Sequence, residues 1–272
     1  MSIMEDVTEE KVLPIKERFV VSKQVDDFFF DIYRVHQFIL QFFKETFSYP
    51  FEWKETINQC YQVGCRSLPL VSVTGFVVGI VFTKQSRPSL ANFGASSWLP
   101  SLMSIALIRA LAPLVTALIV SGKVGSNMGA ELGSMKVTEQ IDAMEVSGTR
   151  PFSYLVVSRI VAITFMMPVL VIYTGLIGLL GSFLNVHATE LTSFTSFFSK
   201  GLSKITFLDL ISSIFRAAVF GFTIGVAGCF QGYYALNGTH GVGKAANSAV
   251  VISMFLIFLE EILIVQVIND FR

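Results

Sequence analysis

Residues 99–121 read LPSLMSIALIRALAPLVTALIVS and contain a single charged side chain, Arg109. A helix needs about 20 mostly apolar residues to cross the roughly 30 Å hydrocarbon core of a bilayer, so this stretch is long enough to span a membrane. Four further windows have the same character, at residues 64–83, 153–185, 207–230 and 247–268. The sequence therefore predicts an all-α membrane protein with five transmembrane helices.

The composition of the whole chain agrees with a membrane location. The 272 residues are 53% hydrophobic and 15% charged, against about 25% charged residues in an average soluble domain. Twenty Lys and Arg residues are balanced by 20 Asp and Glu residues, so no basic excess is available to neutralise nucleic-acid phosphates. The three cysteines, Cys60, Cys65 and Cys229, have neither metal-site nor disulfide spacing. We therefore expect neither a metal nor a nucleic-acid partner.

The distribution of Lys and Arg predicts which side of the membrane each loop faces, because cytoplasmic loops carry an excess of basic residues. Seven basic residues precede residue 64, whereas the loop after the first span has only Lys84 and Arg87. The N-terminus is therefore expected in the cytoplasm. Five spans then place the loops at 122–152 and 231–246 on the cytoplasmic side as well.

The region before the first span is divided by its polarity. Residues 1–25 are assigned to a polar cytoplasmic tail, residues 26–58 to an amphipathic helix in the membrane interface, and residues 59–272 to the transmembrane domain. The alternative for 26–58 is a soluble helix packed on a cytoplasmic domain, which the short remaining tail disfavours. The apolar face of this helix is formed by residues three or four positions apart: Phe28, Ile32, Val35, Ile39 and Phe42.

The loop between the second and third spans has the most detailed pattern. Gly122, Gly125 and Gly129 predict turns at its start, and a helix-compatible run follows from Glu131 to Glu145. A short amphipathic cytoplasmic helix of this kind can dock into a groove on a soluble partner, and the alternative is a connector that lies on the membrane. The expected apolar face comprises Leu132, Met135, Ile141 and Met144, with the acids Glu139, Asp142 and Glu145 elsewhere.

Four ionisable residues fall inside the apolar windows: Arg109, Arg216, Glu260 and Glu261. A charge at the centre of a bilayer costs about 2.5–3.5 kcal/mol even on insertion-derived scales, so such residues face a partner or a wet cavity. Either a functional role or a packing salt bridge explains Arg109 and Glu261, and a structural role is favoured for Arg216. We predict that Arg109 pairs with Glu261, or failing that with Glu260.

A glycine-rich segment precedes the fifth span. Residues 238–245, GTHGVGKA, fit the phosphate-loop pattern G-x-x-x-x-G-K up to the last position, where Ala245 replaces the Ser or Thr that would hold Mg²⁺. Transmembrane windows on both sides also disfavour the soluble α/β sheet that such a loop requires. The simpler interpretation is a tight cytoplasmic turn at Gly241, Gly243 and Lys244 that leads into the fifth span.

Two of these stretches resemble the MlaE-type permeases, the membrane subunits of ABC transporters that move lipids together with MCE-domain proteins. The more specific match is GSNMGAELGSMKVTEQIDAM (125–144), and the second is QGYYALNGTHGVGKAANSAVVIS (231–253). The chain departs from the family at Ala110 and Gln231, where glutamate is frequent. Glu261 corresponds best to the acid that the family has in its last span.

The resemblance implies a homodimer in the inner membrane of a diderm bacterium, moving a lipid substrate with a separate cytoplasmic ATPase and an MCE-domain protein on the far side. The partner ATPase would bind ATP, so this subunit would hold no cofactor and catalyse no reaction itself. An ion-coupled secondary transporter and a membrane scaffold without transport activity remain as alternatives. The resemblance also implies an ATPase-coupling helix that includes Glu131, Leu132, Met135, Glu139, Gln140, Asp142 and Met144.

Overall fold

The computed structural model describes residues 20–48, 52–190, 192–236 and 238–270. Within these ranges all regular secondary structure is helical, as the apolar windows predict. The chain divides into two units, Met1–Leu40 and Gln41–Arg272. The helix α1 (Val20–Thr46) contains the boundary between them. The predicted tail at 1–25 lies mostly outside the described residues.

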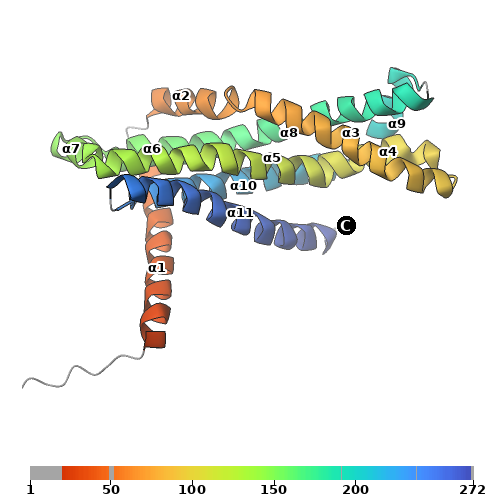
Figure 1. The fold of residues 1–272 in the computed structure, drawn as a ribbon. Helices are drawn as coiled ribbons and strands as arrows, with labels where there is room; N and C mark the ends of the chain where they lie inside the picture. The colour runs from red at the N-terminus through yellow and green to blue at the C-terminus, as the bar shows by residue number, and fades with distance from the viewer. Residues whose placement is uncertain (1–19, 49–51, 191, 237, 271–272) are drawn as a thin grey trace, which may run out of the picture. The chain divides into compact units, whose positions relative to one another are not determined.

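The second unit contains the helices that follow α1 (Figure 1). In chain order these are α2 (Trp53–Gly64), α3 (Leu68–Asn92), α4 (Leu99–Ala106), α5 (Ala112–Val120), α6 (Ser126–Val137), α7 (Gln140–Val146), α8 (Ser158–Glu190), α9 (Phe194–Leu202), α10 (Phe207–Tyr233) and α11 (Gly238–Asp270). A 3₁₀ turn at Ser96–Trp98 precedes α4. Three segments have the wider turns of a π-helix, at Leu107–Leu111, Ser121–Gly125 and Phe152–Val157.

The prediction of five membrane-spanning helices is confirmed. Five helical stretches are long and apolar enough to cross a membrane: Trp53–Asn92, Ser96–Val137, Phe152–Thr189, Phe207–Tyr233 and Gly238–Asp270. Each is longer than its sequence window because the polar residues at the ends of the apolar run remain helical. Short helices and π-helical segments join end to end within the first three stretches.

The predicted turns at Gly122, Gly125 and Gly129 are wrong, because the second stretch continues as helix through all three positions. Gly125 and Gly129 instead allow neighbouring helices to pack closely. A Cβ atom on Gly129 would lie 3.1 Å from the carbonyl oxygen of Ala245 in α11. Small residues at such contacts are typical of helix packing in membranes.

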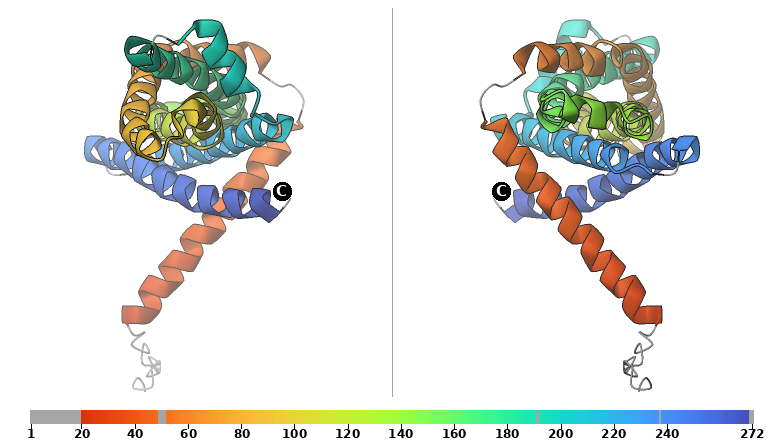
Figure 2. Two further views of the ribbon diagram at one scale, coloured as in Figure 1. Left: turned by 90° about the vertical axis from the view of Figure 1, so that its right-hand side faces the viewer. Right: turned by 90° about the vertical axis from the view of Figure 1, so that its left-hand side faces the viewer.

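Within the second unit, α8 packs against α2, α3 and α10, and α10 also contacts α6 and α11. Figures 1 and 2 show α3, α8 and α10 running side by side, with α11 crossing the others at a slant. The contact between α3 and α8 depends on glycine, since a Cβ atom on Gly79 would overlap the backbone carbonyl of Gly178. Close backbone approach therefore holds the first and third spans together.

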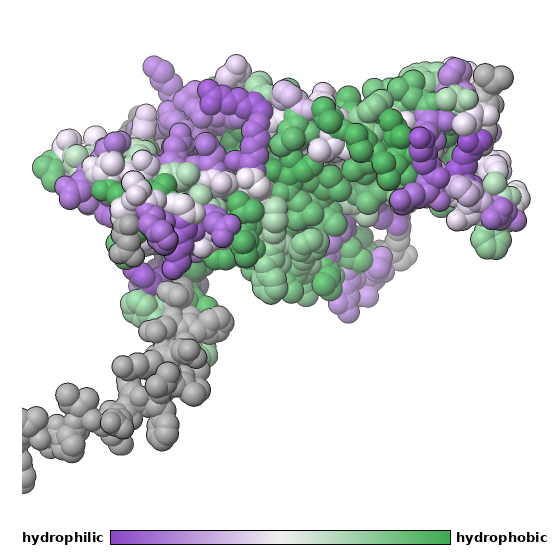
Figure 3. All heavy atoms as spheres, in the orientation of Figure 1, coloured by the Kyte–Doolittle hydropathy of each residue, from purple (hydrophilic) through white to green (hydrophobic). Residues whose placement is uncertain are grey.

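The surface of this unit has an apolar middle and polar ends. Figure 3 shows hydrophobic residues across the middle, with hydrophilic residues toward α7 at one end and toward α9 at the other. We call these the α7 end and the α9 end. Large apolar side chains such as Phe165, Phe215 and Phe255 are more than half exposed on the spans. An exposed apolar band between two polar ends is the surface that a lipid bilayer would cover.

The structure adds two details outside the predicted spans. The single helix predicted at 26–58 is two helices, α1 and α2, and Pro50 lies between them in the sequence, where it lacks the N–H that a helix requires. The segment between the third and fourth spans contains α9. Its side chain Phe197 is fully buried against Leu99, Met103 and Val186, which anchors α9 to the ends of spans two and three.

Candidate functional site

Arg109 lies in the π-helical segment Leu107–Leu111, four residues before Pro113. In a regular α-helix the carbonyl of Arg109 would accept a hydrogen bond from the N–H of residue 113, but proline has no N–H and its ring crowds that carbonyl. Arg216 of α10 takes the missing place, since its Nη1 donates to the Arg109 carbonyl oxygen over 2.9 Å. Pro113 thus creates the acceptor that ties span two to span four.

The side chain of Arg109 pairs with Asp209, and the predicted ion pair with Glu261 is wrong. The Arg109 Nε and Nη2 atoms donate to Oδ1 of Asp209 over 3.1 and 2.7 Å. Asp209 is fixed by a capping box at the start of α10, in which its Oδ2 accepts from the backbone N–H of Thr206 over 3.1 Å. The first turn of α10 therefore holds a carboxylate close to Arg109.

Glu261 instead pairs with Arg216. The Arg216 Nη1 atom donates to Glu261 Oε1 over 2.6 Å, and the two side chains are 2% and 16% exposed. This is the more enclosed of the two pairs, because the Arg109 side chain is 30% exposed. The expected structural role of Arg216 agrees with this geometry, since one guanidinium contacts both span two and span five.

Glu260 points to a different neighbour. Its Oε1 atom accepts a hydrogen bond of 2.5 Å from the hydroxyl of Thr223, two turns beyond Arg216 on α10. Along α10, Asp209 and Arg216 are seven residues apart, which corresponds to about 10 Å at the usual helical rise. The two ion pairs and the Thr223–Glu260 bond therefore form a polar row along α10 that joins spans two, four and five.

The segment predicted as one coupling helix consists of two helices, α6 and α7, which meet at Thr138 and Glu139. Glu139 has φ 59° and ψ 15°, and it is the sole non-glycine residue with positive φ in the described part of the chain. The left-handed conformation ends α6 and turns the chain into α7. No glycine or proline marks this break, which explains why the sequence pattern reads as continuous.

The two helices turn their apolar residues toward the rest of the unit. Leu132 and Ile141 are fully buried, whereas Met135 and Met144 are half-buried. The polar members of the predicted site are exposed: Glu131, Glu139, Gln140 and Asp142. The surface that remains free for a partner on α7 is therefore acidic, and it ends at Val146, whose side chain is 91% exposed.

Two ion pairs stabilise this segment. Lys136 of α6 and Asp142 of α7 are 2.6 Å apart, which clamps the angle between the two helices. Glu131 accepts a hydrogen bond of 3.1 Å from Arg159 at the start of α8, and the Arg159 side chain is nearly buried. The second pair joins the end of span two to the start of span three.

The predicted turn at Gly241, Gly243 and Lys244 is also helical, because α11 begins at Gly238. Gly238 has φ +63°, a left-handed conformation that glycine adopts without strain. A Cβ atom on Gly241 would overlap the carbonyl of Leu236, which makes glycine necessary there. The conformation at 238–245 is a helix start that directly follows span four.

Asp209 is the site residue that sequence reasoning missed. It lies at the third position of the fourth window, FLDL, where it reads as an ordinary end-of-span residue. The signal that identifies it is the pattern Thr206-x-x-Asp209 directly before an apolar run, which is a capping-box signature. A carboxylate held in that way is fixed in direction and available to a cation on a neighbouring helix.

These features define a polytopic helical membrane protein with paired charges inside its spans and an acidic helical hairpin at the α7 end. Residues 56–267 match the family described as Permease MlaE. A probable ABC transporter permease of Rickettsia typhi is 37% identical over 211 residues, 77% of this chain and 81% of that protein. A probable ABC transporter permease of Synechocystis is 34% identical over 208 residues, 76% of this chain and 79% of that protein.

A plant protein is also similar. The chloroplast protein TRIGALACTOSYLDIACYLGLYCEROL 1 of Arabidopsis thaliana is 31% identical over 209 residues, 77% of this chain and 60% of that protein. The chain described here therefore belongs to the MlaE permease family and is the permease subunit of an ABC transporter. Such a subunit implies an ATPase partner and a membrane environment.

Proposed function

We propose that this permease moves a phospholipid or a related lipid between membranes, driven by a separate ATPase that binds the ATP. It would act as a homodimer in the inner membrane of a diderm bacterium, with an MCE-domain protein on the far side. The N-terminus and the α7 end would face the cytoplasm. Residues 1–25 would form a cytoplasmic tail, 26–58 an interfacial region and 59–272 the permease domain.

The observation that supports a lipid substrate is the pairing of the two guanidiniums within the spans. Arg109 is paired with Asp209 and Arg216 with Glu261, so neither cation is left to bind an anionic hydrophilic solute. The outward surface of the spans is apolar, which suits acyl chains. The Arabidopsis relative is named for a glycolipid, trigalactosyldiacylglycerol, and this name also favours a lipid.

The exposed acidic face of α7 supports its assignment as the coupling element. Glu139, Glu145 and Val146 are exposed, and Asp142 is held by Lys136. Lysine is unbranched at Cβ like glutamate, so Glu139→Lys and Glu145→Lys reverse the charge of this exposed face without adding backbone strain at position 139. The fixed angle between α6 and α7 would pass a movement of the ATPase into span two, because α6 is continuous with that span.

The test is co-purification with the ATPase of the same transporter, followed by ATP hydrolysis and transfer of a fluorescent phospholipid between vesicles. The double variant Glu139→Lys/Glu145→Lys should insert normally yet lose the ATPase. Asp270→Lys, which reverses an exposed carboxylate at the other end of the last span, should keep it. Retention of the ATPase and of lipid transfer by the double variant would reject the coupling assignment.

Lipid transfer separately tests the substrate class. The wild-type complex should transfer phospholipid only when ATP is hydrolysed. Hydrolysis that no lipid stimulates, together with absence of transfer, would contradict a lipid substrate while leaving the ATPase partnership intact.

A further inference from the structure

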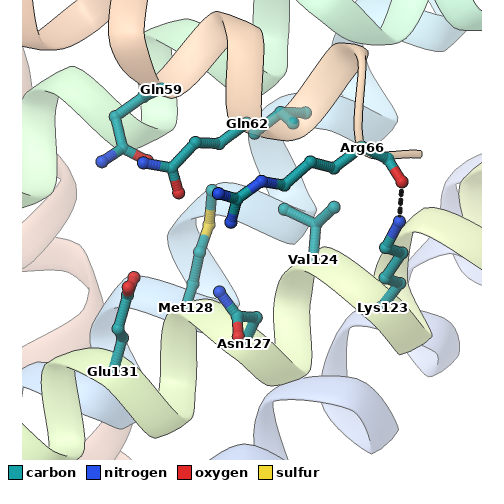
Figure 4. A pocket seen from close by; sticks show the side chains of 9 residues that line it. Gln59, Gln62, Arg66, Lys123, Val124, Asn127, Met128 and Glu131 are labelled. Atoms are coloured by element: carbon teal, nitrogen blue, oxygen red, sulfur yellow. Dashed lines mark hydrogen bonds between the residues drawn. The ribbon is translucent and has the colours of Figure 1, made fainter. Parts of the chain in front are cut away.

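A polar cavity lies between α2 and α6 at the α7 end of the second unit. Its volume is about 160 Å³, several times the ~30 Å³ that one water molecule occupies in the liquid. Figure 4 shows Arg66 and Gln62 reaching over the cavity from the α2 side and Asn127 and Glu131 rising from α6. This cavity is separate from the ion pairs along α10 and from the exposed face of α7.

The cavity carries an excess of positive charge. Arg66 and Lys123 both line it, and Lys123 Nζ donates to the backbone carbonyl of Arg66, which fixes the two cations next to each other. Among the described residues, none accepts a hydrogen bond from the Arg66 guanidinium. The one carboxylate in the lining, Glu131, is already paired with Arg159 over 3.1 Å. Two cations therefore remain for an anion.

The depth of the two cations matches the level of lipid phosphates. Arg66 lies two residues inside the start of the first apolar window at 64, and Lys123 lies two residues past the end of the second at 121. Both are thus at the boundary between hydrocarbon and headgroups. Three buried side chains, Val63, Val124 and Met128, form the apolar wall of the cavity.

We infer that this cavity binds a phosphate-bearing anion, with the headgroup of an anionic phospholipid as its source. The guanidinium of Arg66 would donate two parallel hydrogen bonds to phosphate oxygens, and the ammonium of Lys123 would add a second positive charge. The amides of Asn127 and Gln62 would donate to the remaining oxygens. The apolar wall suits the glycerol carbons of a lipid, which free phosphate lacks. The inference holds whether or not the bound lipid is the cargo, because it requires no ATP.

The experiment uses the full chain in nanodiscs of phosphatidylcholine that contain a minor fraction of photoactivatable phosphatidylglycerol. After irradiation, mass spectrometry should find the label on peptides that include residues 59–66 and 123–131. Arg66→Gln should reduce that label by about tenfold, which corresponds to ~1.4 kcal/mol of binding free energy, because the variant loses the charge-assisted hydrogen bonds to phosphate. Arg66 is exposed, so the variant should fold, and an unchanged elution profile and thermal midpoint would verify this.

The matched control is Lys84→Gln, which removes one positive charge from an exposed position in the same membrane-spanning stretch, Trp53–Asn92, away from the cavity. It should label like the wild type. Equal labelling in Arg66→Gln and Lys84→Gln would overturn the inference, as would equal labelling by photoactivatable phosphatidylcholine. Excess inorganic phosphate should leave the label in place. If phosphate removes it, the lipid source is overturned and the cavity is a site for the free anion.

Discussion

Replacing Arg216 by methionine should destabilise the protein far more than the same change at Arg109. Arg216 is 2% exposed and its removal would leave the carboxylate of Glu261 and the carbonyl of Arg109 without their donor. Removing one partner of a buried ion pair costs about 3–5 kcal/mol. Arg109 is 30% exposed, and Asp209, although 8% exposed, keeps its bond to the Thr206 N–H at the N-terminus of α10, where the helix dipole favours a carboxylate, so Arg109→Met should cost about 1 kcal/mol.

The measurement is thermal unfolding of the detergent-solubilised full chain, followed by size-exclusion chromatography of the folded fraction. In a chain of this size 1 kcal/mol shifts the midpoint by about 2–4 °C, so Arg216→Met should lower it by roughly 6–20 °C. Arg109→Met should lower it by about 4 °C at most. Glu261→Gln removes the stranded charge, and the double variant Arg216→Met/Glu261→Gln should recover part of the loss.

Two results would refute this reasoning. Equal midpoints for Arg216→Met and Arg109→Met would show that the enclosure of the Arg216 pair has no energetic consequence. A double variant whose loss equals the sum of the two single losses would show that Arg216 and Glu261 do not interact, because contacting charges must couple.

Three further predictions test the fold and the orientation in the membrane. Glu139→Val should destabilise the α6–α7 junction by about 1–2 kcal/mol, because a β-branched residue disfavours positive φ. Glu139→Gly should not destabilise it. Limited proteolysis should cleave the junction faster in the valine variant than in the glycine variant. Gly79→Ala should lower the thermal midpoint and Gly243→Ala, where nothing lies within 4 Å, should not. In a variant without the native cysteines, Lys204→Cys should react with a membrane-impermeant thiol reagent added outside the cells, whereas Thr149→Cys should not. Labelling of Thr149→Cys and not of Lys204→Cys would contradict the proposed orientation.

The sequence was sufficient for the five spans because their signal is long and local. Each window holds about 20 apolar residues, and no tertiary contact is needed to recognise a segment that satisfies its own backbone hydrogen bonds in lipid. The structure at the ends of the spans was harder to predict from the sequence. Gly122, Gly125 and Gly129 read as turn formers in isolation, but all three lie inside a helix, where α10 packs closely on Gly125 and α11 on Gly129.

The charge partners could not be read from the sequence alone. Arg109 and Asp209 are 100 residues apart, and Arg216 and Glu261 are 45 apart. The choice between Glu261 and Asp209 as partner of Arg109 depends on which helix faces the π-helical segment, and that is a property of packing. The apolar windows identified Arg109, Arg216 and Glu261 as charges to examine, and only the geometry showed how they combine with Asp209.

The departure at position 110 becomes understandable from this geometry. The family frequently has a glutamate next to the arginine of span two, and Ala110 removes it, so an intramembrane guanidinium would be left without a counter-charge. Asp209 supplies one from span four, held by the capping box of α10. Pro113 frees the carbonyl of Arg109 for Arg216, and Arg216 in turn binds Glu261 of span five. Asp209 of α10 therefore compensates the charge of Arg109, and Glu261 of α11 compensates that of Arg216. Because Arg216 also binds the carbonyl of Arg109, a movement that separates spans two, four and five must break these bonds together.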